Sequence, residues 1–261
     1  MQTATTVTEP RGAVSTTGMV TVRGQHRRSA DVVTELMDVL ADEPRVVACD
    51  LAGMTAEGSA MLAQGFAPVG EYLAYWPGPV VMVYAPDPQV RSRLYAANSG
   101  RRFGIHISRD AAATEPHQLL PRLRRHSLRL SPGPAAAHEA RSFVTQTLLG
   151  WKLPRLVARA GEVVAEVTEV ATRDSTTRLD LMLSRVDDRV RIAVRDHQPQ
   201  PCAASIGELP QSPLTGAGLR LVQTLARGWG VIPARRAGKT VWVVLDTHLK
   251  QAGAPHKTLR R

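Results

Sequence analysis

Apolar residues in the first part of the chain alternate between two spacings. Met19–Val22, Val46–Leu51, Val80–Tyr84 and Ile105–Ile107 are compact apolar runs, which predict short strands. Between them, apolar residues recur three or four positions apart, as on one face of a helix. These helical positions are Val32, Val33, Leu36, Met37 and Leu40; Leu62, Phe66, Val69 and Leu73; and Val90, Leu94 and Ala97. Strands that alternate with helices predict an α/β structure built in layers.

The second part of the chain has a different order of elements. Leu179–Leu183 and Val190–Val194 alternate on either side of Asp187-Asp188 and predict a β-hairpin, and Val241–Leu245 predicts a last core strand. We expect helices on one face of a mixed sheet, and an α/β fold of two domains. The predicted helical positions are Ala140, Phe143, Val144, Thr147 and Leu148; Leu156, Val157, Ala160, Val163, Val164, Val167, Val170 and Ala171; and Leu219, Val222, Leu225 and Ala226.

Composition divides the chain into five predicted segments. Residues 1–17 are Thr-rich and are expected to be disordered, and residues 18–120 form the first domain. The Pro- and Arg-rich residues 121–134 are expected to be a basic linker, followed by a second domain at 135–247 and a basic tail at 248–261. The chain has no signal-peptide pattern and no apolar run near the ~20 residues that span a bilayer. We therefore expect a cytoplasmic protein that has no membrane partner.

Charge alone suggests nucleic acid, because the formal net charge is +10. Eight of the ten excess charges, however, fall in residues 121–134 and 247–261, and neither segment contains an acidic residue. The aromatic content of 4% and the lack of a helix-turn-helix or zinc pattern also argue against nucleic-acid binding. Solvated arms are the favoured interpretation, and docking onto an acidic protein or another polyanion stays open.

The end of the predicted return strand carries the first candidate site residue. Asp196 shares the parity of Val190, Ile192 and Val194, so its carboxylate should point toward the helices and be buried. A buried carboxylate needs hydrogen-bond donors. The amino group of adenine is one such donor, and nearby backbone N–H groups of the chain are the alternative.

Two glycine-containing motifs follow Asp196. Gly216-Ala217-Gly218 opens a helical stripe, where backbone N–H groups and the helix dipole favour an anion, although an ordinary loop entering a helix has the same pattern. Gly238-Lys239-Thr240 leads into the last strand. Thr240 is either a contact behind the base or a β-branched strand residue, and Lys239 either touches phosphate or is solvated.

In this order and spacing, Val194–Pro199, Gly216–Leu219 and Gly238–Trp242 resemble the nucleotide pocket of histidine-kinase-like (GHKL) ATPase domains. The similarity is greatest to the anti-sigma-factor serine kinases of bacteria. It implies a Bergerat-type sandwich, ATP or ADP as ligand, and a mobile lid at residues 199–215. The nucleotide-binding residues that the resemblance implies are Asp196, Gly216, Gly218, Leu219 and Thr240.

One helix departs from this family. Glu166–Ser175 aligns with the family's Glu-Leu-Val-Thr-Asn-Ala-Val-Arg-His-Ala. Glu166 therefore matches the family's catalytic base, and a solvated or ion-paired helix residue is the alternative. The magnesium-binding Asn is replaced by Val170, which has no oxygen to offer a hard cation. Asp174, four residues later on the same side of the helix, is a candidate substitute ligand. We therefore expect impaired Mg²⁺ binding and impaired phosphoryl transfer.

The first domain resembles the STAS fold of anti-sigma-factor antagonists. The similarity rests on Asp50–Thr55 and Gly58–Leu62, and only Ser59 matches the family's phosphorylated serine. Ser59 is expected near a helix start, where its hydroxyl either caps free N–H groups or accepts a phosphate.

Three functions remain open at this stage. The favoured one is a regulatory, adenine-nucleotide-binding protein that acts by partner switching in bacterial transcription, with a sigma factor or an anti-sigma antagonist as partner. The second is an active serine/threonine kinase of the same type, and the third is a basic nucleic-acid-associated regulator. A homodimer is also open.

Overall fold

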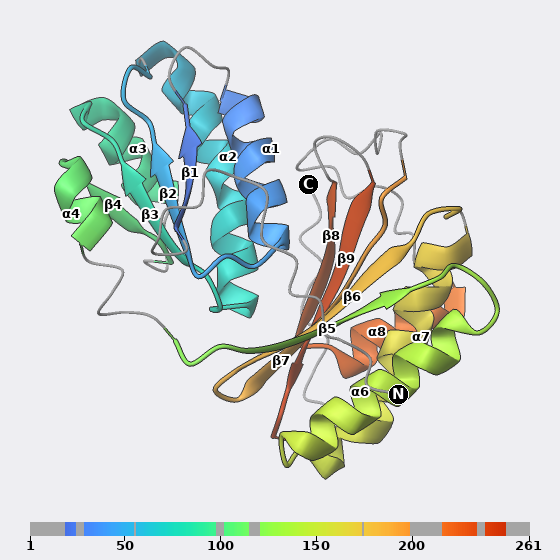
Figure 1. Ribbon diagram of the computed structural model, residues 1–261. Coiled ribbons are helices and arrows are strands. Elements are labelled where there is room, and N and C mark those ends of the chain that lie inside the picture. The colour runs from blue at the N-terminus through green and yellow to red at the C-terminus, as the bar shows by residue number, and fades with distance from the viewer. Residues whose placement is uncertain are drawn as a thin grey trace.

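Two β-sheets of opposite type organise the molecule (Figure 1). One has four strands, all parallel, and the other has five strands, all antiparallel. The α/β class predicted from the sequence is therefore confirmed. The computed structural model describes residues 19–24, 29–54, 56–97, 102–114, 121–173, 175–198, 216–233 and 238–248.

The parallel sheet follows the predicted alternation of strands and helices. Its strands pair in chain order, and each crossover between parallel neighbours is made by a helix. The short helix α4 (Arg109–Thr114) was not predicted. The strands are β1 (Met19–Arg23), β2 (Val46–Asp50), β3 (Val80–Tyr84) and β4 (Gly104–His106), and the connecting helices are α1 (Ser29–Ala41), α2 (Ala56–Tyr75) and α3 (Pro88–Ala97).

The second sheet has the strand order β5-β6-β7-β9-β8. The predicted hairpin is confirmed, but the expected mixed sheet is wrong, because every neighbouring pair runs antiparallel. The strands are β5 (Arg124–Leu130), β6 (Leu179–Val186), β7 (Arg189–Arg195), β8 (Gly228–Pro233) and β9 (Lys239–Asp246).

Strand β5 corrects the expected linker at residues 121–134. Its segment pairs with β6 along its whole length, and Leu130 is buried in the core. The arginines of the segment lie at the edge of the sheet, where charged side chains are common. Because arginines are so frequent in this segment, the short alternation of Leu128 and Leu130 is hard to recognise in the sequence. The segment therefore has the composition of a linker although it forms a strand.

Both faces of the antiparallel sheet are covered. Helices α6 (Ala136–Gly150), α7 (Val157–Arg173) and α8 (Gly216–Leu225) pack on one face, and the short 3₁₀ helix η1 (Pro154–Leu156) joins α6 to α7. On the other face, Trp242 and Val244 share a hydrophobic cluster with residues of α1 and α2 (Figure 1). The expectation of helices on one face alone is therefore incomplete, because α1 and α2 of the parallel unit cover the second face.

A buried acid lies at the centre of this contact. Glu43 follows α1 with a φ of 51°, a left-handed conformation that costs free energy for residues other than glycine. Its side chain is 1% exposed, and its carboxylate accepts hydrogen bonds from Arg191 Nη1 at 2.6 Å and from the Ser184 hydroxyl. The Nε of Arg125 lies 3.2 Å from the same carboxylate. The sequence gives no sign of this cluster, because its members are far apart along the chain.

Strand β7 carries more contacts to the parallel unit on the same face. Arg189 donates to the carbonyls of Ala74 and Tyr75 at 2.9 Å, in the last turn of α2. Arg195 binds Asp38 at 3.1 Å and also Asp42, both at the C-terminal end of α1. The alternate residues of β7 thus face opposite neighbours: the arginines meet the parallel unit, and the valines and isoleucine meet α6 and α7.

Candidate functional site

Asp196 follows the last residue of β7 and is 2% exposed, so its predicted burial is confirmed. Its Oδ1 accepts the backbone N–H of Lys239 at 2.9 Å, and its Oδ2 lies 3.3 Å from the Lys239 ammonium. A third contact joins the Asp196 N–H to the Lys239 carbonyl at 3.0 Å. Lys239 of β9 therefore supplies both the backbone donor and the positive charge that this buried carboxylate needs.

The close approach of Lys239 to Asp196 depends on Gly238. This glycine has a φ of 80°, in the left-handed region, and a Cβ at this position would overlap the carbonyl and the carboxylate of Asp196. Only glycine satisfies both conditions without strain. The Gly238-Lys239-Thr240 motif of the sequence is thus brought against Asp196, as expected, but through its first two residues.

Thr240 faces the other side of the sheet. It is the register partner of Arg195, and directly opposed residues of neighbouring strands share a face. The Arg195 guanidinium reaches α1, so Thr240 belongs to the face covered by the parallel unit, whereas Asp196 and Lys239 belong to the helix face. Its buried hydroxyl has no hydrogen-bond partner among the residues that the structure describes. The β9 residue beside Asp196 is Lys239, not Thr240.

A second pair of predicted residues meets between α7 and α8. The Glu166 carboxylate packs against the backbone of Gly218, where a Cβ would overlap it. Because α8 begins at Gly216, this places a negative charge in the first turn of a helix, where anions are stabilised by the helix dipole. The candidate base and one glycine of the predicted phosphate loop are therefore neighbours.

Val170 lies one turn after Glu166 on α7. It is 6% exposed and belongs to the hydrophobic cluster between the helices and the antiparallel sheet, so its place in the apolar stripe is confirmed. Asp174, the candidate substitute ligand, lies outside the described residues, as do the expected lid at 199–215 and the side chain of Leu219; of Gly216 only the backbone, at the start of α8, is described. Within the described part of the chain, no group of three metal-ligating side chains gathers.

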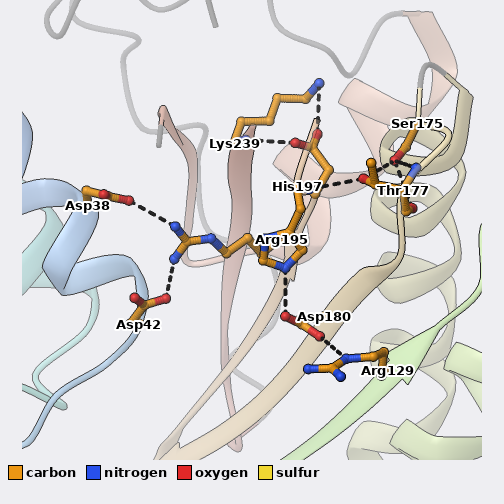
Figure 2. Close-up of polar contacts among 10 residues, drawn as sticks. Asp38, Asp42, Arg129, Ser175, Thr177, Asp180, Arg195, His197 and Lys239 are labelled. Atoms are coloured by element: carbon orange, nitrogen blue, oxygen red, sulfur yellow. Dashed lines mark hydrogen bonds and ion pairs between the residues drawn. The ribbon is translucent and has the colours of Figure 1, made fainter. Parts of the chain in front are cut away.

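A chain of polar contacts borders Asp196 on the side of β6. The His197 Nε2 donates to Asp180 at 2.7 Å, and Arg129 Nε binds the other oxygen of Asp180 at 3.1 Å (Figure 2). The His197 N–H donates to the hydroxyl of Thr177 at 3.3 Å, and Ser175 contacts the same hydroxyl. These contacts fix the chain direction directly after Asp196, and no sequence motif indicated them.

Asp180 gives this polar chain a measurable pH dependence. The hydrogen bond from His197, followed by that from Arg129, lowers the pKa of Asp180 although burial opposes the shift. Ionised Asp180 therefore stabilises the folded protein at any pH above its unfolded pKa of about 3.9. This contribution to the free energy of unfolding is lost as the pH falls through the lower pKa of the folded state. We expect Asp180→Asn to flatten the loss of stability on acidification, measured as urea midpoints between about pH 6 and about pH 2.5. Parallel curves for the variant and the wild type would contradict this assignment.

Ser59, the candidate phosphosite, lies in the first turn of α2, which begins at Ala56. Its side chain is outside the described part of the structure, so both interpretations of its hydroxyl stay predictions. No helix among the described residues is both long and apolar enough to cross a bilayer. No protein-family model matches the chain, and no curated protein matches it in sequence.

Proposed function

We propose that this chain is a regulatory binding protein of the anti-sigma-factor type, in which the GHKL-like unit has lost phosphoryl transfer. In this proposal the unit of the antiparallel sheet retains a weak site for ATP or ADP. The unit of the parallel sheet corresponds to a STAS-like antagonist domain. The protein would act by partner switching on a sigma factor or its antagonist, in the cytoplasm of a bacterium.

The observation that carries the weak affinity in this proposal is the double contact between Asp196 and Lys239. The resemblance assigns Asp196 to the adenine amine, yet both of its oxygens already have a partner within the chain. The Lys239 ammonium competes with the adenine amine for this carboxylate, and that competition lowers the affinity for a nucleotide.

One further observation supports loss of catalysis rather than loss of the fold, and a second supports weak binding of phosphate. Val170 adds apolar surface where phosphoryl transfer needs an oxygen ligand for Mg²⁺. The Glu166 carboxylate of α7 lies against Gly218 in the first turn of α8, so it would repel a phosphate that approached the same backbone. An active kinase is therefore the second candidate function. The calorimetric experiment described next distinguishes it from a binding protein without phosphoryl transfer.

Calorimetry on the full chain tests this function. We expect ATP and ADP to bind with dissociation constants of about 100 μM or weaker, and with equal affinity in Mg²⁺ and in EDTA. No labelled phosphate should pass to a serine of an antagonist protein. A Mg²⁺-dependent gain of about tenfold or more, together with phosphate transfer, would establish the kinase instead. Absence of any nucleotide binding up to millimolar concentration would refute the nucleotide site.

A further inference from the structure

Strand β5 is one edge of the antiparallel sheet. It pairs with β6 at each position from Arg124–Arg185 to Leu130–Leu179, and no described strand lies on its other side. The segment contains neither proline nor glycine, so every residue has an N–H and no bulge-forming residue interrupts it. Backbone groups of alternate residues point away from β6 and can pair with another strand. β5 is therefore a template of seven residues for strand addition.

The start of this edge is positively charged and only partly neutralised. Arg122 and Arg124 are exposed and form no ion pair with any described residue. Arg124 stands opposite Arg185, a like-charge pair that disfavours the isolated sheet. Arg185 donates to the carbonyls of Trp151 and Asp187 rather than to a carboxylate. Positive charge thus accumulates at the point where β5 and β6 meet.

Cations project from both faces of β5. His126 packs edge-on against Trp151 of the helix layer, with ring centroids 5.6 Å apart, so Arg124 shares that face. Arg125 reaches Glu43 on the opposite face, where Arg129 also lies beside Asp180. The side chains of Arg125 and Arg129 are 34% and 50% exposed, respectively. A strand added beside β5 would therefore meet positive charge on both of its faces.

A second copy of this chain is disfavoured at that edge, because β5 carries three arginines and no acidic residue. Antiparallel pairing of two β5 strands about Ser127 would place Arg125 of each copy opposite Arg129 of the other. Such like-charge pairs are destabilising when directly opposed. The expected occupant is instead an extended segment that carries carboxylates on both faces.

We propose that β5 binds an acidic extended segment of a partner protein, which adds to the antiparallel sheet as a sixth strand. Backbone hydrogen bonds to the outer edge supply affinity, and carboxylates opposite the arginines select the partner. This inference does not depend on nucleotide binding at Asp196, because β5 lies at the edge of the sheet and Asp196 follows β7 in its interior.

Fluorescence anisotropy on the full chain tests this interaction. The probe is a fluorescein-labelled peptide, Thr-Glu-Glu-Val-Glu-Thr-Glu-Val, and the matched peptide is N-methylated at every residue, which keeps its charge but removes the backbone donors. We expect the methylated peptide to bind at least about tenfold more weakly. The double variant Arg122→Glu/Arg124→Glu should lose at least about tenfold in affinity for the unmethylated peptide. Arg155→Glu, at another exposed arginine, should leave affinity unchanged.

Folding of the double variant is checked by its melting temperature. The new glutamate at position 124 would oppose Arg185, so we expect the melting temperature to be unchanged or higher. Equal binding of the methylated peptide would overturn strand addition, and full binding by the double variant would overturn the site. Displacement of the peptide by an equally charged single-stranded DNA at similar concentration would overturn the protein partner in favour of a general polyanion surface.

Discussion

Replacing Glu43 by alanine is expected to lower the free energy of unfolding by about 3–5 kcal/mol, the largest effect of any single substitution considered for this protein. The carboxylate is buried and accepts hydrogen bonds from Arg191 and Ser184, with Arg125 alongside. Arg191 is itself 0% exposed. Removing Glu43 would leave an uncompensated guanidinium between two packed units, and desolvating an unpaired charge is far costlier than losing a surface ion pair.

The position of Arg191 increases this cost. Its Nε has no hydrogen-bond partner among the described residues, and its guanidinium lies over the Tyr72 ring at 5.9 Å from the centroid. The side chain cannot reach water without opening the contact between β7 and the two helices. Burial raises the pKa of Tyr72 well above its ordinary value, so this ring stays neutral near pH 7 and cannot replace the lost carboxylate.

Urea unfolding followed by tryptophan fluorescence measures this effect. Glu162→Ala is the matched control, because Glu162 is exposed on α7, and its loss should change the free energy of unfolding by less than about 0.5 kcal/mol. The triple variant Glu43→Met/Ser184→Ala/Arg191→Met removes all three polar groups together and should recover much of the stability, since apolar replacement of a buried ion pair is often neutral. A loss below about 1 kcal/mol in Glu43→Ala would show that water reaches Arg191 in solution.

Periodicity was sufficient to predict most elements with one clear spacing. The strands of the parallel sheet, the hairpin of β6 and β7, and the stripe on α7 all follow from alternation or from helical recurrence. β8 was missed because Gly228 and Gly230 occupy alternate positions, and glycine is depleted in strands. The structure explains both glycines, since a Cβ would overlap the Tyr75 ring at the first and the Trp242 ring at the second.

One feature of the sequence indicates that the second face of the antiparallel sheet is also buried. Val241–Leu245 is apolar at every position, and a strand of that kind is buried on both faces. The arginines of β7 concealed this signal, because Arg189, Arg191 and Arg195 gave the strand the pattern of one solvated face. Their partners come from residues 38–75, and a contact between segments so distant in sequence has no local pattern.

The candidate site was predictable only in part, for a related reason. Parity predicted the burial of Asp196, but the identity of its donor depends on how β9 lies against the end of β7. The sequence allowed either Lys239 or Thr240 to lie beside Asp196, and the register between β7 and β9 places Lys239 there. The resemblance to nucleotide-binding domains gave no sign that the Lys239 ammonium lies against this carboxylate.

Freeing Asp196 is expected to have the largest effect on ligand binding. In Lys239→Thr the backbone N–H at 2.9 Å remains, while the ammonium is lost and a β-branched residue suited to a strand replaces it. The second oxygen of Asp196 then becomes available to the amine of adenine. A hydrogen bond to a charged group contributes about 1.5–3 kcal/mol, so ATP affinity should rise about tenfold to a hundredfold, equally in Mg²⁺ and in EDTA.

Adding Val170→Asn to Lys239→Thr should make that affinity depend on the metal. The asparagine oxygen would lie one helical turn from Glu166 and offer Mg²⁺ the hard ligand that valine lacks. We expect a further gain of about tenfold in Mg²⁺ and none in EDTA, measured by calorimetry after the melting temperature has shown that the buried amide is tolerated.

Arg155→Thr, which removes an exposed positive charge elsewhere, should leave ATP affinity unchanged. Asp196→Asn in the Lys239→Thr background should cancel the first gain, because an amide presents only one acceptor oxygen and its other group repels the adenine amine. If neither variant gains affinity, Asp196 is a structural acid held by Lys239, and the proposed nucleotide site is refuted.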